Sequence, residues 1–236
     1  YASVSLLPYP ELKDKPVAVG GSSENRHGIV LAKNEAAKKY GIKTAQTIQS
    51  ALRLCPDLII LPPQRERYEY FSKIINEIYN SYTDLVEPFG IDESWLDITG
   101  SLHLFGSPRE VADDIRNTIL KETGLTASVG VSFTKSFAKL GSDYKKPDAT
   151  TYLPPQAIPE KVWPLDAGEL LFVGRHTREL LQANRIRTIG QMAAAPPELL
   201  EKLLGKMGRQ LSDSARGCSA HSHHYHISNP ANCQIF

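Results

Sequence analysis

From residue 90 to residue 153 the sequence alternates strand-like and helix-like segments, and this alternation constrains the fold more than any other feature. A strand that bears Asp92 comes first, and residues 125–133 and 150–153 read as two more strands. Helical periodicity occupies residues 108–123 and 136–144 between them. The order strand, helix, strand, helix, strand predicts a sheet with helices on one face, an α+β arrangement.

Two adjacent carboxylates, Asp92 and Glu93, interrupt the first of these strands. Like charges this close repel, and each raises the pKa of the other unless a cation lies between them. Mg²⁺ prefers carboxylate oxygens and keeps waters or substrate phosphates as its remaining ligands. The pair therefore suggests a Mg²⁺ site for phosphoryl transfer, although a solvated acidic turn would have the same sequence.

The N-terminal quarter of the chain predicts a small α/β layer. Residues 16–20 and 28–32 read as the two strands of a hairpin, and residues 58–61 as another strand. Residues 34–40 predict a short helix that ends at a glycine, and residues 47–54 predict a second helix capped by a threonine. An amphipathic helix follows.

Composition excludes some classes of protein and leaves others open. The chain has 236 residues, of which 41% are hydrophobic, so more than one domain is expected. Its net charge of +1 gives no global attraction for nucleic acid. Residues 175–209 are locally basic, which suits either a nucleic-acid contact or a solvated helical face. Three scattered cysteines fit a reducing cytoplasm, and the sequence predicts no membrane span.

Three long motifs, in order, resemble one known family. The segment Gly90 to Gly100 reads GIDESWLDITG, and the run from Gly124 to Asp148 contains GVSFTKSFAKLGSDYKKP. Together they resemble the palm signatures of Y-family translesion DNA polymerases of the DNA polymerase IV type. The stretch from Arg26 to Thr44 is similar to the fingers segment of that family. The resemblance covers residues 1 to about 217.

The resemblance implies a fold and a division into domains. It implies an α+β protein with a ferredoxin-like palm, small α/β fingers and an all-helical thumb containing helix-hairpin-helix elements. The boundaries expected are 1–64 for the fingers, 65–153 for the palm and 154–217 for the thumb. Residues 218–236 are expected to be a truncated or disordered tail, since nothing there resembles the little finger domain of the family. A zinc site among its cysteines and histidines is a weaker interpretation.

The resemblance also implies roles for single residues. Asp92 and Glu93 align with the catalytic palm carboxylates, which in the family hold two Mg²⁺ ions. Tyr1 aligns with the steric gate that excludes a 2′-hydroxyl. Lys38 and Lys146 align with residues that bind the triphosphate. The remaining metal ligand of the family is an Asp five residues before the position of Tyr1, so the N-terminus of the natural protein is expected further upstream.

Further fingers positions correspond to the pocket for the nascent base pair. Ile29, Leu31 and Ala45 fall where the family places small or apolar residues over the base pair, although plain core packing would also explain them. Glu35 stands where the family usually has a phosphate-binding Tyr, and a carboxylate there would repel a triphosphate. It must therefore turn away, or the affinity falls.

The helical segment after Pro164 corresponds to the DNA-binding thumb. Its resemblance to a helix-hairpin-helix element implies backbone and side-chain contacts to a DNA phosphate. The residues expected to contact DNA are Gly174, Arg175, Thr177, Arg178 and Lys206.

The predicted function is template-directed DNA polymerisation of the translesion type, with the fragment itself expected to be inactive. The partners implied are primer-template DNA and a dNTP. In the family the sliding clamp binds a tail, which is expected to be missing here, and a cytoplasmic monomer is expected. One alternative is a non-catalytic DNA-binding remnant of such a polymerase. Another is an unrelated enzyme with a ferredoxin-like domain, such as a nucleotide cyclase, which the joint presence of the motifs argues against.

Overall fold

The computed structural model describes residues 1–21, 28–218 and 233–236. It divides into two units, one formed by residues 1–75 with 123–125, and the other by residues 76–122 with 126–236. No helix in the described part of the chain has the length and apolar character needed to cross a membrane.

The first unit contains a three-stranded sheet in the order β2-β1-β3. Strand β1 (Val17–Gly20) pairs antiparallel with β2 (Val30–Lys33) and parallel with β3 (Ile59–Leu61). The predicted hairpin and the third strand are therefore confirmed. The turn predicted between β1 and β2 lies mostly outside the described residues.

Short helices accompany this sheet, and both predicted helices are present, the second with its predicted threonine cap. Helix α2 (Glu35–Lys39) is capped by Asn34, and α3 (Ile48–Leu54) is capped by Thr47. The unit also contains α1 (Ala2–Leu6), the 3₁₀ helix η1 (Pro10–Leu12) and the beginning of α4 (Arg65–Asn80). The buried side chains shared by these elements are those of Ala18, Val30, Ala37, Ile42, Ile48, Ala51, Cys55 and Leu58.

The second unit contains a five-stranded mixed sheet in the order β4-β5-β8-β6-β7. Its strands are β4 (Val86–Pro88), β5 (Ser94–Asp97), β6 (Val129–Ser132), β7 (Thr150–Leu153) and β8 (Gln234–Ile235). Strands β6 and β7 are parallel, and the other neighbours are antiparallel. Helices α5 (Leu102–Phe105), α6 (Pro108–Thr123) and α7 (Lys135–Tyr144) complete this part of the chain.

Helix α6 begins and packs as predicted. The Ser107 amide donates to Glu110 at 2.8 Å, and the Glu110 amide lies 3.4 Å from the Ser107 hydroxyl, which forms the capping box. The apolar stripe of the helix is buried, and Gly124 follows the helix with a φ of +71°.

Strand β6 differs from its prediction. A half-buried strand over residues 125–133 was expected, but β6 has four residues, all of them buried. Successive side chains point to opposite faces of a strand, so both faces are covered. Helix α7 covers one face closely, because a Cβ on Gly130 would lie only 1.9 Å from the Ala138 carbonyl oxygen.

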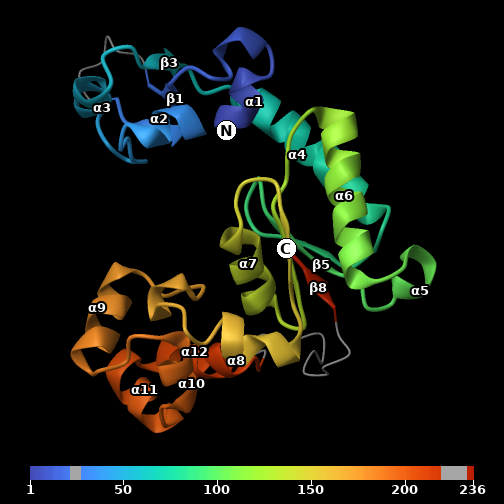
Figure 1. Ribbon diagram of the computed structural model, residues 1–236, viewed down its shortest axis with the longest axis vertical. Helices are drawn as coiled ribbons and strands as arrows, with labels where there is room; N and C mark the ends of the chain where they lie inside the picture. Colours follow the sequence, from blue (N-terminus) through green and yellow to red (C-terminus); the bar gives the residue numbers. More distant parts are fainter. Residues whose placement is uncertain (22–27, 219–232) are drawn as a thin grey trace. The chain divides into compact units, whose positions relative to one another are not determined.

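The C-terminal residues also differ from their prediction. Gln234 and Ile235 form β8 in the centre of the sheet, between β5 and β6, where a disordered tail was expected (Figure 1). The predicted cysteine and histidine cluster lies mostly outside the described residues. Within the described residues Cys218 is exposed, Cys233 is buried, and neither forms a disulfide.

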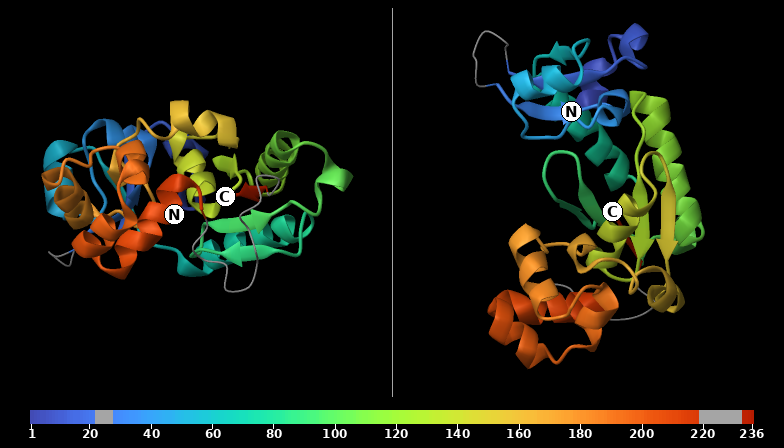
Figure 2. Two further views of the ribbon diagram at one scale, coloured as in Figure 1. Left: turned by 90° about the horizontal axis from the view of Figure 1, so that it is seen from below. Right: turned by 60° about the vertical axis from the view of Figure 1, so that its left-hand side comes forward.

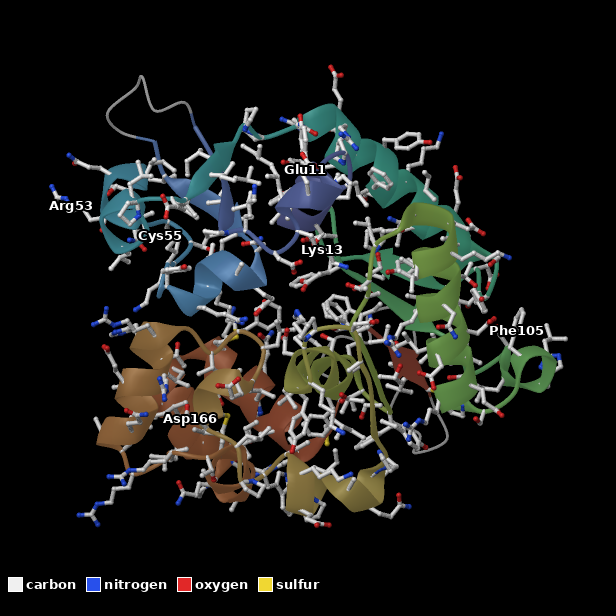
Figure 3. The ribbon with its side chains drawn as sticks, turned by 45° about the horizontal axis from the view of Figure 1, so that its top comes forward. Glu11, Lys13, Arg53, Cys55, Phe105 and Asp166 are labelled. Carbon is white, nitrogen blue, oxygen red and sulfur yellow. The ribbon has the colours of Figure 1, made fainter. Side chains whose placement is uncertain are left out.

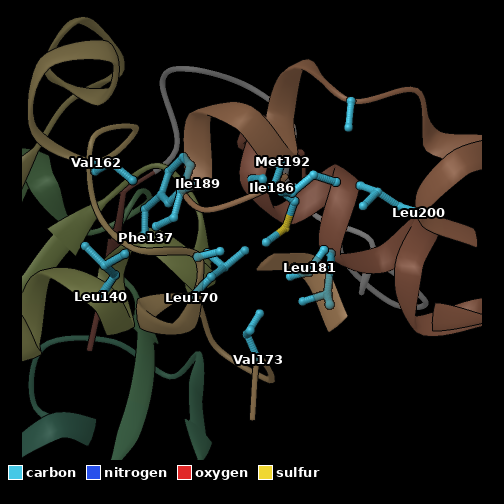
Figure 4. Packing of buried hydrophobic residues seen from close by; sticks show 14 of the residues in the cluster. Phe137, Leu140, Val162, Leu170, Val173, Leu181, Ile186, Ile189, Met192 and Leu200 are labelled. Carbon is cyan, nitrogen blue, oxygen red and sulfur yellow. The ribbon is translucent and has the colours of Figure 1, made fainter. Parts of the chain in front are cut away.

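Between residues 155 and 217 the regular elements of the described chain are all helices, apart from an isolated β-bridge between Asp166 and Thr188. Figure 2 shows the last four helices of this segment gathered together. The elements are η2 (Pro155–Ala157), α8 (Ile158–Lys161), η3 (Ala167–Glu169), α9 (Arg175–Ala183), α10 (Ile189–Ala194), α11 (Pro197–Leu204) and α12 (Lys206–Arg216). Phe137 and Leu140 of α7 join the same core as Leu181, Ile189 and Met192, so this segment packs on α7 (Figure 4).

Candidate active site

A tight hairpin turn presents the two carboxylates. Asp92 and Glu93 lie between β4 and β5, just before β5, rather than inside a strand. The Phe89 amide donates to the Glu93 carbonyl at 2.8 Å and closes the turn. Gly90 adopts a φ of +91°, which an L side chain rarely tolerates. The turn leaves Asp92 exposed and Glu93 partly buried.

Helix α7 supplies a lysine directly to Glu93. The Lys139 ammonium lies 2.6 Å from Glu93 Oε1 and 3.2 Å from Asp143 Oδ2. Asp143 in turn accepts Lys146 Nζ at 2.6 Å through its other oxygen. Four side chains of alternating charge therefore run from the hairpin turn along α7 to the lysine predicted to bind a triphosphate.

The pKa values follow from burial and from these partners. Burial alone would lower the pKa of Lys139, but the hydrogen bond that Lys139 donates to Glu93 and the charges of Asp143 and Glu93 outweigh it, so the pKa is raised. Burial would raise the pKa of Asp143, but Lys146 and Lys139 outweigh it and the pKa is lowered. Both groups are therefore charged at neutral pH.

Two further groups border the turn. Lys135, one turn before Lys139, pairs with Glu87 of β4, and its ammonium lies 5.5 Å from the centroid of the Trp95 ring. Burial, followed by the charge of Asp92, raises the pKa of Tyr79 to about 12. Tyr79 therefore stays neutral beside the acidic turn.

The donor set of the turn fits Mg²⁺. Mg²⁺ is commonly bound by one or two carboxylates, with waters and substrate phosphates completing its octahedron. Asp92 is exposed, and one oxygen of Glu93 is held by Lys139. Among the described residues no group of three or more His, Cys, Asp or Glu side chains comes together as a metal site. The turn thus offers two carboxylates to a hard cation.

Tyr1 lies on the first unit and is held by another aromatic ring. Its ring centroid is 4.7 Å from that of Tyr68, and the rings are inclined by 50°. The Tyr68 hydroxyl is itself fixed by the buried Ser5 hydroxyl at 2.8 Å. Tyr1 is 47% exposed, so it remains partly accessible.

The predicted base-pair residues of the first unit lie at its surface. Ile29 is 42% exposed and Leu31 is 41% exposed, while Val30 between them is fully buried. Ala45 is exposed, and its amide donates to the Val30 carbonyl at 2.8 Å. The three side chains are therefore not core residues, which removes core packing as the explanation for them.

Lys38 forms an ion pair with Glu35, the residue whose carboxylate was expected to repel a triphosphate. Its ammonium lies 3.6 Å from Glu35 Oε1, and both side chains are about two-thirds exposed, at 64% and 66%. An exposed pair of this kind contributes little stability. Glu35 therefore partly neutralises Lys38 in this conformation.

Two of the residues predicted to contact DNA form ion pairs with acidic residues of this chain. Gly174 precedes α9, and Arg175 on its first turn pairs with Glu179 at 2.8 Å. Arg178 donates twice to Asp166, at 2.8 and 2.9 Å, and Figure 3 shows where Asp166 lies. Thr177 is partly buried, whereas Lys206 is exposed at the start of α12.

Sequence reasoning missed Lys139 and Asp143 as site residues. Both lie inside the motif already singled out, at positions i and i+4 of a helix, where side chains meet on one face. That spacing was available in the sequence, but the approach of Glu93 to the same face depends on the tertiary fold.

Residues 1–143 match the impB/mucB/samB family. The chain belongs to this family. It is 50% identical over 217 residues to DNA polymerase IV of Acetivibrio thermocellus. The aligned residues cover 92% of this chain and 54% of that protein. It is 41% identical to DNA polymerase IV 1 of Bacillus subtilis, with 92% and 52% covered. The chain thus spans about half the length of these curated relatives.

Solved structures agree with the family and the fold. A Y-family DNA polymerase chimera of Dbh and Dpo4 matches with a TM-score of 0.85 and 29% identity, over 91% of this chain and 64% of that one. An insertion ternary complex of Dbh DNA polymerase matches with a TM-score of 0.82 and 28% identity, over 90% and 64%. DinB from Sulfolobus solfataricus matches with a TM-score of 0.81 and 28% identity, over 91% and 64%.

Proposed function

We propose that this chain carries the catalytic carboxylates of a template-directed DNA polymerase of the translesion type. The enzyme would add dNTPs to a primer 3′ end. The observation that carries the proposal is the hairpin turn of Asp92 and Glu93, joined through Lys139 and Asp143 to Lys146. Membership in a family whose relatives are named DNA polymerase IV supplies the substrate class.

Each residue of the site would do one task. Asp92 and Glu93 would hold two Mg²⁺ ions, which activate the primer 3′-oxygen and neutralise the triphosphate charge when bound. Lys146 and Lys38 would contact the triphosphate, with Lys38 exchanging Glu35 for a phosphate. Tyr1 would pack under the sugar and leave no room for a 2′-hydroxyl. Ile29, Leu31 and Ala45 would cover the nascent base pair through their exposed side chains.

Primer extension with Mg²⁺ and dNTPs tests the proposal, using this chain with any further sequence that its gene encodes. Asp92→Asn should lower extension at least about a hundredfold, because a lost metal ligand removes several kcal/mol of transition-state stabilisation. Asp84→Asn is the matched control, since Asp84 is an exposed acid outside the turn. Extension by Asp92→Asn within tenfold of the unchanged protein would contradict the assignment.

We also infer that the helical segment contacts DNA phosphates through cations that have no acidic partner. Among the described residues Arg185, Arg187, Lys202 and Lys206 form no ion pair, whereas Arg175 and Arg178 do. Each phosphate neutralised contributes about −0.9 to the slope of log K against log salt for duplex DNA. Lys206→Ala should therefore weaken DNA binding and flatten this slope by about one unit.

The matched control is Lys161→Ala on α8, outside the basic segment, which should leave the slope unchanged. Fluorescence anisotropy at several salt concentrations measures both variants. Equal slopes for Lys206→Ala and the unchanged chain would refute the role of Lys206. DNA binding without any extension by the longer protein would instead favour a non-catalytic DNA-binding remnant.

A further inference from the structure

A row of alternating charges connects the two ends of the site. Glu93 contacts Lys139, Lys139 contacts Asp143, and Asp143 contacts Lys146. Lys139 has the least exposed side chain of the row, at 14%, against 30% for Glu93, 46% for Asp143 and 51% for Lys146. Lys139 is therefore the inner link, and it is the one cation in the row with two carboxylate partners.

We propose that Lys139 is a positioning residue that pairs with the Glu93 carboxylate until a divalent cation binds there. Asp143 then becomes the remaining carboxylate partner of the Lys139 ammonium. The proposal rests on the proposed function, since it assumes that Glu93 is a metal ligand. Lys139 itself would touch neither substrate nor metal.

The reason lies in the limited choice of partners for a largely buried ammonium. A buried charge is costly unless it is paired and hydrogen-bonded. If Glu93 turned both oxygens to a cation, Lys139 would lose its shorter contact, of 2.6 Å, and would keep Asp143 at 3.2 Å. Asp143 uses its other oxygen for Lys146, so it can serve both lysines.

Packing leaves the ammonium little freedom to leave the row. The Lys139 ammonium lies 4.7 Å from the centroid of the Phe236 ring, a cation–π contact that covers one of its sides. Movement toward Asp143 is therefore the short path open to it.

Binding of Mn²⁺ alone tests the exchange without any polymerase activity. Mn²⁺ suits the same oxygen ligands as Mg²⁺, and the free ion can be counted by electron paramagnetic resonance. Lys139→Met should tighten Mn²⁺ binding about tenfold, because it removes the charge that competes for Glu93. Lys135→Met is the matched control, because Lys135 is a lysine of the same helix that pairs with Glu87 instead. It should change the affinity less than about threefold.

Asp143→Asn supplies an effect of opposite sign. Without its second partner Lys139 should hold Glu93 more strongly, so Mn²⁺ binding should weaken severalfold. In the Lys139→Met background the same change should have almost no effect, whereas a simple loss of negative charge would weaken binding equally in both backgrounds.

Lys139→Arg keeps the charge, so its Mn²⁺ affinity should stay within about threefold of that of the unchanged chain. Urea unfolding checks that each variant folds. If Lys139→Met fails to fold, Lys139→Gln replaces it in both arms.

The outcomes separate this proposal from the proposed function. Mn²⁺ binding that Asp92→Asn abolishes, but that Lys139→Met leaves unchanged or weakens, would overturn only the exchange. An Asp143→Asn effect of the same size in both backgrounds would do the same. Mn²⁺ binding that Asp92→Asn leaves unchanged would overturn both the metal site and the exchange.

Discussion

Asp166 illustrates how one carboxylate can organise the start of the helical segment. It caps η3 by accepting the Gly168 amide at 2.8 Å, and it receives both hydrogen bonds from the Arg178 guanidinium. The hydrogen bond from Arg178, followed by that from the Gly168 amide, lowers the pKa of Asp166. A planar guanidinium matches a carboxylate at two points, which lysine could not do.

At this scale we predict a pH dependence of stability. The pKa of Asp166 is lower in the folded chain than the value of about 3.9 expected when unfolded. The contribution of Asp166 to the free energy of unfolding is therefore fully present above about pH 4. It is lost as the pH falls through the lowered pKa of the folded state. Urea unfolding of the unchanged chain and of Asp166→Asn should differ at pH 6, and the difference should shrink toward pH 3. A constant difference across that range would disprove the role of Asp166.

Among the elements, β6 and α7 of the second unit are in close backbone contact, and glycine makes this contact possible. The face of β6 at Gly130 meets the backbone of α7, and a Cβ there would lie 1.9 Å from the Ala138 oxygen and 2.4 Å from the Ser142 nitrogen. Backbone cannot give way as the end of a flexible side chain can. This contact helps to hold Lys139 and Asp143 of α7 against the sheet that ends in the acidic turn.

We predict that Gly130→Ala destabilises the chain by about 3 kcal/mol, because the added methyl group overlaps backbone on the packed face. Gly100→Ala is the control, since a Cβ at Gly100 would meet nothing within 4 Å. The free energy of unfolding from urea titration measures both. Equal stability of the two variants would mean that α7 does not lie against β6 as described.

For the molecule as a whole, the C-terminal residues provide an internal strand rather than a tail. Strand β8 pairs with β5 on one side and β6 on the other, joining segments more than a hundred residues apart. The Phe236 amide and carbonyl both bond to Gly130, at 2.8 and 2.9 Å. The Phe236 ring packs against Trp95 at 4.9 Å between ring centroids. Without these residues β5 and β6 would face each other with unpaired backbone groups.

Removing the Phe236 ring should therefore destabilise the second unit. We predict a loss of about 3 kcal/mol for Phe236→Ala, because the side chain is 8% exposed and its removal leaves a cavity beside Trp95. Phe172→Ala is the matched control, since Phe172 is 56% exposed. Thermal and urea unfolding give the comparison, with a larger effect expected at Phe236. A loss below 1 kcal/mol at Phe236 would show that β8 is not part of the folded core.

Local sequence determined the elements whose signals lie within a few residues. The caps of α2 and α3, the capping box of α6 and strand β7 follow from short-range hydrogen bonding and periodicity, so they were predictable. The acidic pair was also predictable, because two adjacent carboxylates before a strand are chemically conspicuous.

Only the tertiary structure decided the rest, because it depends on contacts between distant residues. The pairing of Lys139 with Glu93 spans 46 residues, and the pairing of β8 with β5 spans still more. Neither pairing leaves a local sequence pattern. A lysine on a helix is ordinarily a surface residue, and the last four residues of a chain are ordinarily a loose tail. Burial of both faces of β6 was hidden for the same reason, because the helix that covers Gly130 is recognised only once it packs there.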